Sequence, residues 1–433
     1  METMRRIFFL YNNYEREHVN VELISKRLES KNVQTFQGGI TDCDILKKLF
    51  LARPHVIFTY PVVTYHQINI YMMLKATFHS VIITFTTEGL AQFHLDEISK
   101  LFVGFYDFPA ELVDYHFFWG KYMAKYVGRE LYRQHKVMKR EQIKVFGNPM
   151  YEKTAVYAHP FQWKDMDDRK TKVLILTGFH TSVYTEQDFI NAQDVVNVKG
   201  KSEEEILQDE TFIKYKELAA SEKVYAEKYT RHIVEEANRN PEVLFVVKLH
   251  PKEISIKGYA PDKLKYLKKL ENIENIQIIE ESVPIGSLLP YFQLLIHYGS
   301  TVDLEAYIYK VPTVKIELRD IKNCFIAEAN RTTASTYYVD IDEENAISEF
   351  IDKVRAGEEL FRQNKLTEKQ LYYYMNYKAE ENYTPSEQIA DFLSGSLQFN
   401  KLNLTVYERL KYLCLWMMRT LKWRLLPVIW KRI

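Results

Sequence analysis

Short apolar runs alternate with amphipathic segments along most of the chain. In the first half, runs rich in β-branched and aromatic residues predict strands at 6–11, 33–36, 56–60, 81–86, 115–119 and 143–146. Between them, apolar residues at helical spacing predict a helix carrying Val19, Leu23 and Leu28 on one face, and further helices at 42–51, 65–78 and 121–135. This alternation is typical of a parallel sheet covered by helices on both faces. Residues 1–150 are therefore predicted to form a Rossmann-like α/β domain.

The same alternation restarts after a charged segment at 163–170. Strands are predicted at 172–177, 243–248, 276–280, 294–297 and 312–316, with a long helical region from about 203 to 240 and mainly helical sequence over 342–395. A second Rossmann-like domain is therefore expected over 170–395. Two such domains in one chain are expected to face each other across a cleft, with ligands at the carboxyl ends of the strands.

Composition removes several classes of protein. Among the 433 residues, Lys and Arg number 58 and so do Asp and Glu, so the formal net charge is zero, which argues against a dedicated nucleic-acid binder. The three cysteines, at 43, 324 and 414, are far apart and form no CxxC motif, which argues against a disulfide framework or a zinc site and favours a reducing cytosol. No apolar stretch reaches the length of a membrane-spanning helix.

A HisPro dipeptide follows the strand predicted at 243–248. Pro251 biases His250 towards an extended backbone, which would place the imidazole at the strand tip. There it could bind or protonate a leaving phosphate, and Lys248 and Lys252 would raise the local positive potential. The alternative is an ordinary loop histidine whose hydrogen bonds are satisfied.

Two other predicted strand ends in the second domain carry hydroxyl groups and glycine. Gly299, Ser300 and Thr301 open a predicted helix, and such a helix end suits a phosphate or carboxylate, although the same residues also describe an ordinary helix cap. Glu305, one turn into that helix, could accept hydrogen bonds from ribose hydroxyls. The turn that begins at Thr177 and Gly178 is a further nucleotide-binding candidate, and it contains neither a GxGxxG fingerprint nor a Walker loop.

The first domain offers one candidate base. Glu88 follows a predicted strand and precedes Gly89, so its carboxylate could take a proton from an acceptor hydroxyl, with Gly89 allowing close approach on the acceptor side. The alternative is a glutamate that favours a helix N-terminus. The Asp-Cys-Asp sequence at 42–44 imitates a metal-binding DxD, but it is better explained by Thr41 or Asp42 capping the next helix. No metal site is predicted.

The C-terminal segment 404–433 differs from the rest of the chain. It contains seven Lys or Arg and one Glu. Trp416, Trp423 and Trp430 recur every seven residues on one helical stripe, and Arg419, Arg424 and Lys431 are among its basic residues. A basic helix with a Trp and Leu face is typical of a helix that lies in the membrane interface. The alternative is a terminal helix packed on the core.

The motifs resemble those of bacterial surface-polysaccharide glycosyltransferases of the GT-B type and, more distantly, of transferases that use CMP-activated sialic acid or Kdo. An acidic-Gly motif, a HisPro motif and a Ser/Thr motif occur in that order, here at 87–89, 250–251 and 300–301. The segments 113–120, 145–149 and 297–313 also resemble the family, over roughly residues 1–340. One departure is Thr87, where the family often has a second acid. The resemblance implies a metal-independent transferase with its acceptor in the first domain and its nucleotide sugar in the second.

The expected protein is a GT-B glycosyltransferase without a cofactor, which moves a sugar from a nucleotide-sugar donor, CMP-linked, to a lipid-linked acceptor in capsule or lipopolysaccharide biosynthesis. Its expected location is cytoplasmic, peripheral on the inner face of the cell membrane, with the anionic lipid surface as a partner. One alternative keeps the fold and transfers glycerol phosphate from CDP-glycerol, as teichoic-acid enzymes do. Another is a non-catalytic protein docked on the membrane.

Overall fold

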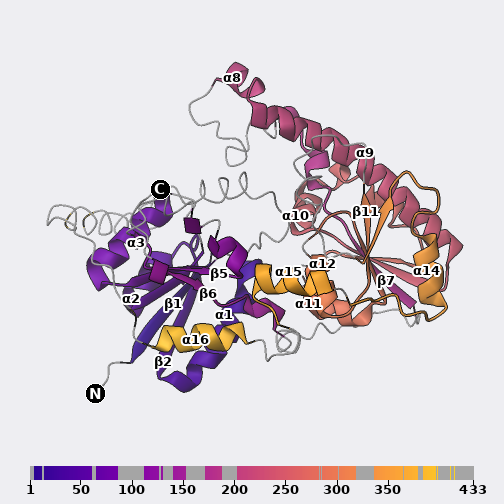
Figure 1. The fold of residues 1–433 in the computed structure, drawn as a ribbon. Helices are drawn as coiled ribbons and strands as arrows, with labels where there is room; N and C mark the ends of the chain where they lie inside the picture. The colour runs from indigo at the N-terminus through magenta and orange to yellow at the C-terminus, as the bar shows by residue number, and fades with distance from the viewer. Residues whose placement is uncertain are drawn as a thin grey trace. The chain divides into compact units, whose positions relative to one another are not determined.

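The computed structural model describes residues 4–11, 14–60, 65–85, 112–125, 128–129, 140–152, 171–187, 202–281, 283, 285–300, 302–317, 336–363, 365–378, 384–395, 397, 410 and 414. They form two compact units (Figure 1). Unit 1 contains the described residues up to 152 together with those from 368 onwards. Unit 2 contains the described residues from 171 to 367.

Unit 1 is built on a sheet of six parallel strands. These are β1 (Arg5–Tyr11), β2 (Val33–Gly39), β3 (Val56–Thr59), β4 (Val81–Phe85), β5 (Tyr115–Phe118) and β6 (Ile143–Val145), in the order β2-β1-β3-β4-β5-β6. Its helices include α1 (Tyr14–Leu28), α2 (Ile45–Ala52) and α3 (Tyr65–Phe78). Strands β3, β4 and β5 are buried throughout, as expected for strands covered on both faces. All six predicted strands of this half are confirmed, with ends that differ by a few residues.

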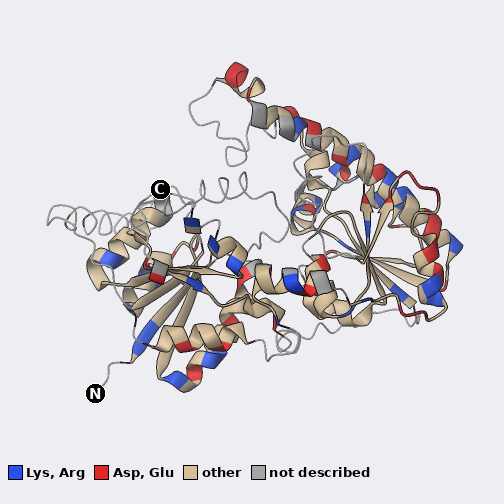
Figure 2. Ribbon diagram, viewed as in Figure 1, with Lys and Arg blue, Asp and Glu red and all other residues tan. Residues whose placement is uncertain are grey.

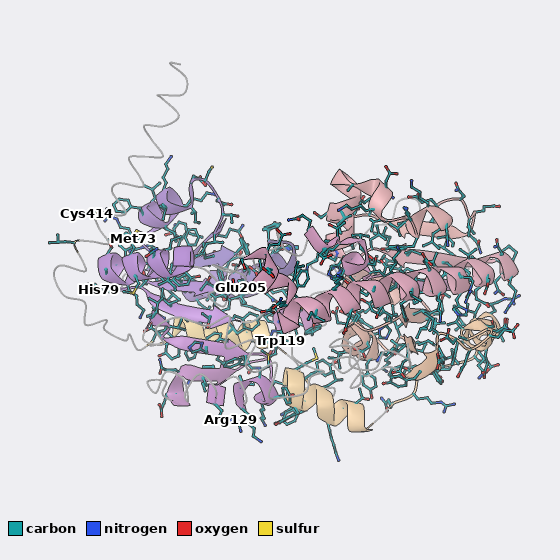
Figure 3. All side chains as sticks on the ribbon, turned by 90° about the horizontal axis from the view of Figure 1, so that it is seen from above. Met73, His79, Trp119, Arg129, Glu205 and Cys414 are labelled. Carbon is teal, nitrogen blue, oxygen red and sulfur yellow. The ribbon has the colours of Figure 1, made fainter. Side chains whose placement is uncertain are left out.

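A buried ion pair joins α3 to the middle of this sheet. Lys75 Nζ lies 2.6 Å from Asp114 Oδ2, and neither side chain is exposed to solvent. Asp114 also accepts a hydrogen bond from the Ile82 amide at 2.7 Å. At the other end of β5, Trp119, labelled in Figure 3, packs edge-on against Tyr151 with ring centroids 5.4 Å apart. The Asp114 bond to Ile82 therefore links the start of β5 to β4, and the Trp119–Tyr151 contact holds the segment that follows β5.

Helix α16 (Pro385–Ser394) packs on unit 1, beside α1 (Figure 1). The Phe392 ring contacts Phe117 and Phe146 at centroid distances of 5.3 and 5.6 Å. The Ser386 hydroxyl donates to Glu152 Oε2 at 2.9 Å. The sequence pattern predicted a second domain over 170–395. The structure instead returns the chain to the first sheet, because α16 fills an apolar face that the first half leaves open.

Unit 2 is also built on six parallel strands. These are β7 (Thr171–Leu176), β8 (Val243–Lys248), β9 (Ile276–Ile279), β10 (Leu294–His297), β11 (Thr313–Glu317) and β12 (Tyr337–Asp340), in the order β12-β11-β10-β7-β8-β9. Its helices include α8 (Glu203–Leu207), α9 (Glu210–Arg239), α10 (Pro251–Tyr259), α11 (Ile285–Leu288), α12 (Val302–Ile308) and α14 (Ser348–Arg355). Helix α15 (Lys365–Met375) crosses the boundary between the units. The predicted strands of this half are confirmed, and β12 was not predicted, because this edge strand has only one buried residue.

The 30-residue α9 buries an aromatic stripe against this sheet. Tyr225, Tyr229, Ile233 and Ala237 recur every four residues and are at most 4% exposed. Tyr229 Oη lies within hydrogen-bonding distance of the Leu176 and Ile296 carbonyls, so it links the helix to β7 and β10. The short α8 before it begins with a capping box between Ser202 and Glu205, the latter labelled in Figure 3.

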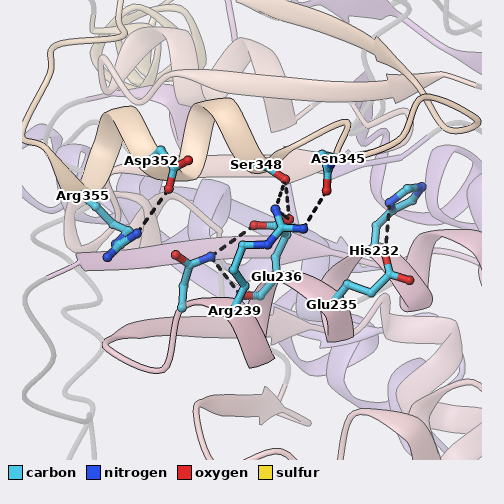
Figure 4. A network of polar contacts seen from close by, with 9 residues as sticks. His232, Glu235, Glu236, Arg239, Asn345, Ser348, Asp352 and Arg355 are labelled. Atoms are coloured by element: carbon cyan, nitrogen blue, oxygen red, sulfur yellow. Dashed lines mark hydrogen bonds and ion pairs between the residues drawn. The ribbon is translucent and has the colours of Figure 1, made fainter.

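A polar network ties the end of α9 to α14 (Figure 4). Arg239 Nη1 donates to Glu236 Oε1 at 2.8 Å, and Arg239 Nη2 donates to Asn345 Oδ1 at 2.6 Å. Ser348, at the start of α14, hydrogen-bonds both Arg239 and Glu236. Glu236 is 3% exposed, so the guanidinium compensates a buried carboxylate.

Basic and acidic residues are interspersed along the described helices and strands of both units (Figure 2), which agrees with the balanced composition. Within the residues that the structure describes, no helix is long and apolar enough to cross a membrane.

Candidate functional site

The strand order of unit 2 creates a topological switch point. The chain passes from β7 to β8 and β9 in one direction, and then places β10 on the other side of β7. Open α/β sheets bind their ligands outside the carboxyl ends of the strands at such a point. The segments that follow β7, β8 and β10 therefore lie side by side, and they are the three segments that the sequence analysis selected in this half.

His250 lies at the end of β8, where it caps α10. Its backbone is extended, with φ −66° and ψ 144°, as the following Pro251 predicted. Its Nδ1 accepts a hydrogen bond from the Lys252 amide at 3.2 Å. The ring is thus held by the first turn of the helix and is half-buried rather than a freely rotating surface histidine.

Glu253 completes this cap and ties two strand ends together. Its carboxylate accepts from the His250 amide at 2.8 Å, the Thr177 hydroxyl at 2.6 Å and the Phe179 amide at 2.7 Å, and it also bonds the Tyr266 hydroxyl. Burial raises the pKa of this carboxyl, and the hydrogen bonds oppose the shift. Glu253 was not among the residues predicted from the sequence, although a capping residue followed three positions later by Glu is a recognisable capping-box signal.

His180 stands directly against His250. The two imidazole rings are stacked, with centroids 4.9 Å apart and planes inclined by 16°. His180 opens a 3-10 helix (His180–Val183) in the turn after β7. Thr177 and Gly178 of this turn were predicted from the sequence as nucleotide-binding residues and His180 was not, because only the adjacency of β7 and β8 brings the two histidines together.

A second buried carboxylate holds the same turn from the other side. Glu222, on α9, accepts a hydrogen bond from the Thr181 hydroxyl and lies 3.4 Å from Tyr298 Oη. Burial raises the pKa of Glu222 to about 7, and the nearby Glu253 charge adds to the shift. Tyr298 also donates to the Gly178 carbonyl at 2.8 Å. The turn is therefore fixed at both ends by groups from α9, α10 and β10.

Gly178 lies close under the ring of Tyr298. A Cβ at this position would lie 3.2 Å from Tyr298 Cε1, closer than a comfortable contact. Glycine therefore allows the backbone to pass under the tyrosine ring, whereas from the sequence Gly178 was predicted only as a nucleotide-binding residue.

The β10 end supplies a hydroxyl and a buried acid. Ser300 Oγ accepts from the Val302 amide at 3.3 Å, in the manner of a cap. Glu305 is 5% exposed. Burial raises the pKa of Glu305 to about 8, Lys248 counteracts the shift and Asp303 adds to it. A largely protonated carboxyl can donate as well as accept a hydrogen bond, so it can bind a ribose hydroxyl in either sense.

Several residues selected from the sequence lie outside the described part of the chain. In the acceptor-side motif and the Ser/Thr motif these are Glu88, Gly89 and Thr301. In the C-terminal segment they are Trp416, Arg419, Trp423, Arg424, Trp430 and Lys431.

The Asp-Cys-Asp sequence forms a turn before α2. Asp44 occupies the N-cap position without a side-chain capping bond, so the expected cap by Thr41 or Asp42 is not what the structure shows. Asp42 Oδ2 instead accepts from the Gly39 amide at 3.0 Å and from Lys48 Nζ at 3.0 Å. Among the described residues, no three His, Cys, Asp or Glu side chains gather where they could hold a metal ion.

Unit 1 contains a polar cavity of about 410 Å³ between α1 and the edge strand β2. Tyr11, at the end of β1, and Gln37 are hydrogen-bonded to each other in its wall. The Tyr14 and His18 rings, stacked at 4.9 Å, line it from α1. The sequence pattern did not predict this cavity, because its walls come from three separate elements.

Comparison with known proteins supports the fold. No protein-family model and no curated protein sequence matches the chain. Among solved structures, a Listeria monocytogenes protein assigned as a UDP-N-acetylglucosamine 2-epimerase has a TM-score of 0.51 at 12% identity, covering 93% of this chain and 100% of that one. A further UDP-N-acetylglucosamine 2-epimerase has a TM-score of 0.50 at 10% identity, covering 91% and 96%.

The wall teichoic acid polymerase TagF has a TM-score of 0.48 at 11% identity, covering 90% of this chain and 88% of that one. At these identities the likeness concerns the fold. Together with the two six-stranded parallel sheets, the comparisons establish an α/β chain of the GT-B type, built from two Rossmann-like units.

Proposed function

We propose that this protein is a glycosyltransferase that takes its sugar from a nucleotide-activated donor bound at the β7, β8 and β10 ends of unit 2. The observation that carries the proposal is the stacked His180 and His250 pair at adjacent strand ends of a GT-B fold. Imidazole N–H groups are suited to phosphate oxygens, and Lys248 and Lys252 add positive charge. Stabilising the charge that develops on the departing nucleotide is the largest contribution expected from such a site.

The roles of the other residues follow from their positions. Thr177, Gly178 and the Gly299–Ser300 turn border the switch point, where a phosphate and a ribose would lie. Glu305 is suited to the ribose hydroxyls. The acceptor hydroxyl would be deprotonated by Glu88 in the first domain, and the polar cavity beside Tyr11 offers hydroxyl and carboxylate groups for a glycan chain. No metal or cofactor is part of the proposal.

The donor is proposed to be CMP-linked, from the resemblance of the motifs, and the acceptor to be a lipid-linked surface glycan. The basic tryptophan segment at 416–431 would hold the enzyme on the inner face of the cell membrane. CDP-glycerol transfer remains the alternative reaction, and a non-catalytic binding protein is the alternative from another class.

Purified protein incubated with CMP-, UDP- and CDP-activated donors and a lipid-linked glycan separates these activities. Transfer of a sugar with release of nucleotide supports the proposal. Release of CMP with glycerol phosphate on the acceptor indicates the alternative reaction, and interconversion of UDP-sugars without an acceptor indicates an epimerase. Failure of every nucleotide to raise the melting temperature at saturating concentration would contradict an enzyme of this kind, since binding at 100 times the dissociation constant stabilises by about 2.7 kcal/mol.

The Glu88→Gln variant tests the division of roles between the two domains. Transfer should be lost while nucleotide affinity is nearly unchanged, since the donor lies in unit 2 and glutamine keeps the size of the side chain. Calorimetric titration with the nucleotide measures the affinity. A collapse of nucleotide binding in this variant would remove Glu88 from the acceptor side.

A further inference from the structure

The two stacked histidines are not equivalent. His250 Nδ1 accepts the Lys252 amide hydrogen, so the proton of its neutral ring must be on Nε2. An imidazolium has two donors and no acceptor, so protonation at Nδ1 would break the cap of α10. Protonation of His180, which opens the 3-10 helix without capping it, leaves that bond intact. His250 is therefore suited to act as a neutral Nε2–H donor.

The stacking itself opposes a second charge. At a centroid separation of 4.9 Å, two imidazolium rings would repel each other, and an anion beside both rings would relieve that repulsion. The backbone segments that carry the two rings are held together, because Glu253 binds the His250 amide, the Thr177 hydroxyl and the Phe179 amide of the His180 turn. Anion binding and protonation should therefore favour each other.

Other ionisable groups border the pair. They are Lys248 at the end of β8, Lys252 and Glu253 on α10, Glu222 on α9, Tyr184 beside the His180 ring, and Tyr298 after β10. The carboxylates of Glu222 and Glu253 are occupied by hydroxyl and amide donors of the same turn. The groups that can respond to an incoming anion are thus the imidazoles and the two lysines.

We propose that His180 is the proton-carrying member of this pair and His250 its neutral partner, so that a phosphoryl group bound at the ends of β7 and β8 draws one proton from solvent onto His180. The inference rests on the proposed function. It adds His180 to the site, assigns the neutral Nε2–H tautomer to His250, and couples phosphate binding to pH. The proton moves from solvent to an imidazole nitrogen, and no bond of the ligand changes.

Calorimetric titration of the full chain at pH 7.5, in buffers of different ionisation enthalpy, measures the coupling. The ligands are UDP-N-acetylglucosamine, CDP-glycerol and CMP-sialic acid, because their phosphates do not titrate near neutrality. For the ligand that binds, the dependence of the heat on buffer should correspond to uptake of about one proton. In His180→Gln that dependence should vanish and the affinity should fall about 10- to 100-fold.

His250→Asn and His79→Asn are the matched variants. Asparagine is a good N-cap, so His250→Asn should keep the fold, lose affinity and retain the proton uptake. His79, which follows α3 in unit 1 (Figure 3), has a φ of 56° that suits asparagine, so His79→Asn should behave like the parent protein.

Binding without proton uptake in the parent protein, or unchanged uptake in His180→Gln, would overturn the inference and leave the proposed function standing. Absence of binding by all three ligands would overturn both.

Discussion

At the scale of single residues, the candidate site depends on groups that never reach the surface. Glu253 is fully buried and accepts from four donors, in the turn after β7, at the cap of α10 and in the segment after α10. His180 and His250 are placed by this carboxylate rather than by their own packing alone. The positions of the two histidines are thus fixed by a buried residue that does not itself contact a ligand.

Replacing Glu253 by alanine should destabilise the protein by about 2–4 kcal/mol, because it leaves two amides and two hydroxyls without their acceptor. Urea unfolding followed by circular dichroism measures the change. Glu227→Ala, on the exposed face of α9, is the control and should stay within about 0.5 kcal/mol of the parent. Equal midpoints for the two variants would show that Glu253 does not hold the strand ends.

Glu222 should make stability depend on pH. Its pKa is raised from 4.5 to about 7, so between these values the folded state binds more protons than the unfolded state. The stability gained by this protonation is complete below pH 4.5 and is lost as the pH rises through about 7. Glutamine cannot titrate, so Glu222→Gln should flatten this fall.

Unfolding free energies at pH 5.5 and pH 8 measure the effect in both proteins. Part of the fall should persist in Glu222→Gln, because the pKa of Glu305 is also raised, to about 8. An unchanged fall in the variant would mean that the Glu222 carboxyl is ionised throughout this range.

His250→Ala should lower turnover by at least about 100-fold, as expected for a lost donor to a developing charge. Steady-state rates on folded protein measure it. Alanine removes both the cap of α10 and the imidazole donor. Asparagine keeps the cap but not the imidazole, so His250→Asn measures the loss of the imidazole alone. Turnover near that of the parent in His250→Asn would remove the imidazole from the mechanism.

At the scale of elements, buried polar links decide how helices sit on the sheets. In unit 1 the link is the Lys75–Asp114 pair between α3 and β5. Desolvation lowers the pKa of Lys75, and the attraction of Asp114 opposes that shift. The pair is therefore held against the cost of burial by geometry and by the additional bond from the Ile82 amide.

Asp114→Ala should cost about 3–5 kcal/mol, because it leaves a buried ammonium without its partner. The double variant Lys75→Met with Asp114→Leu should recover most of that loss, since apolar groups of similar size need no partner. Thermal and urea unfolding of the single and double variants test both statements. A double variant as unstable as the single one would show that the Ile82 amide, rather than the ion pair, dominates.

At the scale of the whole molecule, the chain returns to its first unit after completing its second. Helix α16 buries Ile389, Ala390 and Leu393, and Phe392 contacts three aromatic rings of the β5–β6 region. Unit 1 is therefore not an independent N-terminal segment, because its core is closed by residues near the other end of the sequence.

Two truncations separate α16 from the basic segment that follows it. A chain ending after residue 396 should keep its melting temperature and its nucleotide binding, and should no longer sediment with anionic vesicles, because the basic tryptophan segment is removed. A chain ending after residue 382 should also lose α16 and melt more than about 5 °C lower.

Vesicle sedimentation and scanning calorimetry compare the two truncated chains with the full chain. High salt should weaken vesicle binding by the full chain only partly, since salt does not screen the tryptophan contribution. Equal sedimentation of the full chain and of the chain ending after residue 396 would favour the alternative, in which the basic segment is a helix packed on the core.

The hydrophobic pattern by itself determined the class of the fold and nearly every strand, because buried parallel strands read as continuous apolar runs. It also located the three chemically unusual segments of unit 2, since Gly, Pro and hydroxyl residues mark strand ends. The edge strand β12 was not predicted, because one buried residue in four gives no recognisable hydrophobic pattern.

Only the tertiary structure decided which of those segments meet. Strand order cannot be read from local periodicity, and it is the pairing of β7 with β8 that brings His180 to His250. The same holds for Glu222, Glu253 and Lys75, whose burial depends on distant partners, and for α16, whose apolar face fits one sheet rather than the other. Local helix or strand propensity follows from neighbouring residues, whereas contacts between distant segments follow from how the layers pack. The candidate site consists of contacts between distant segments, so only the tertiary structure could reveal it.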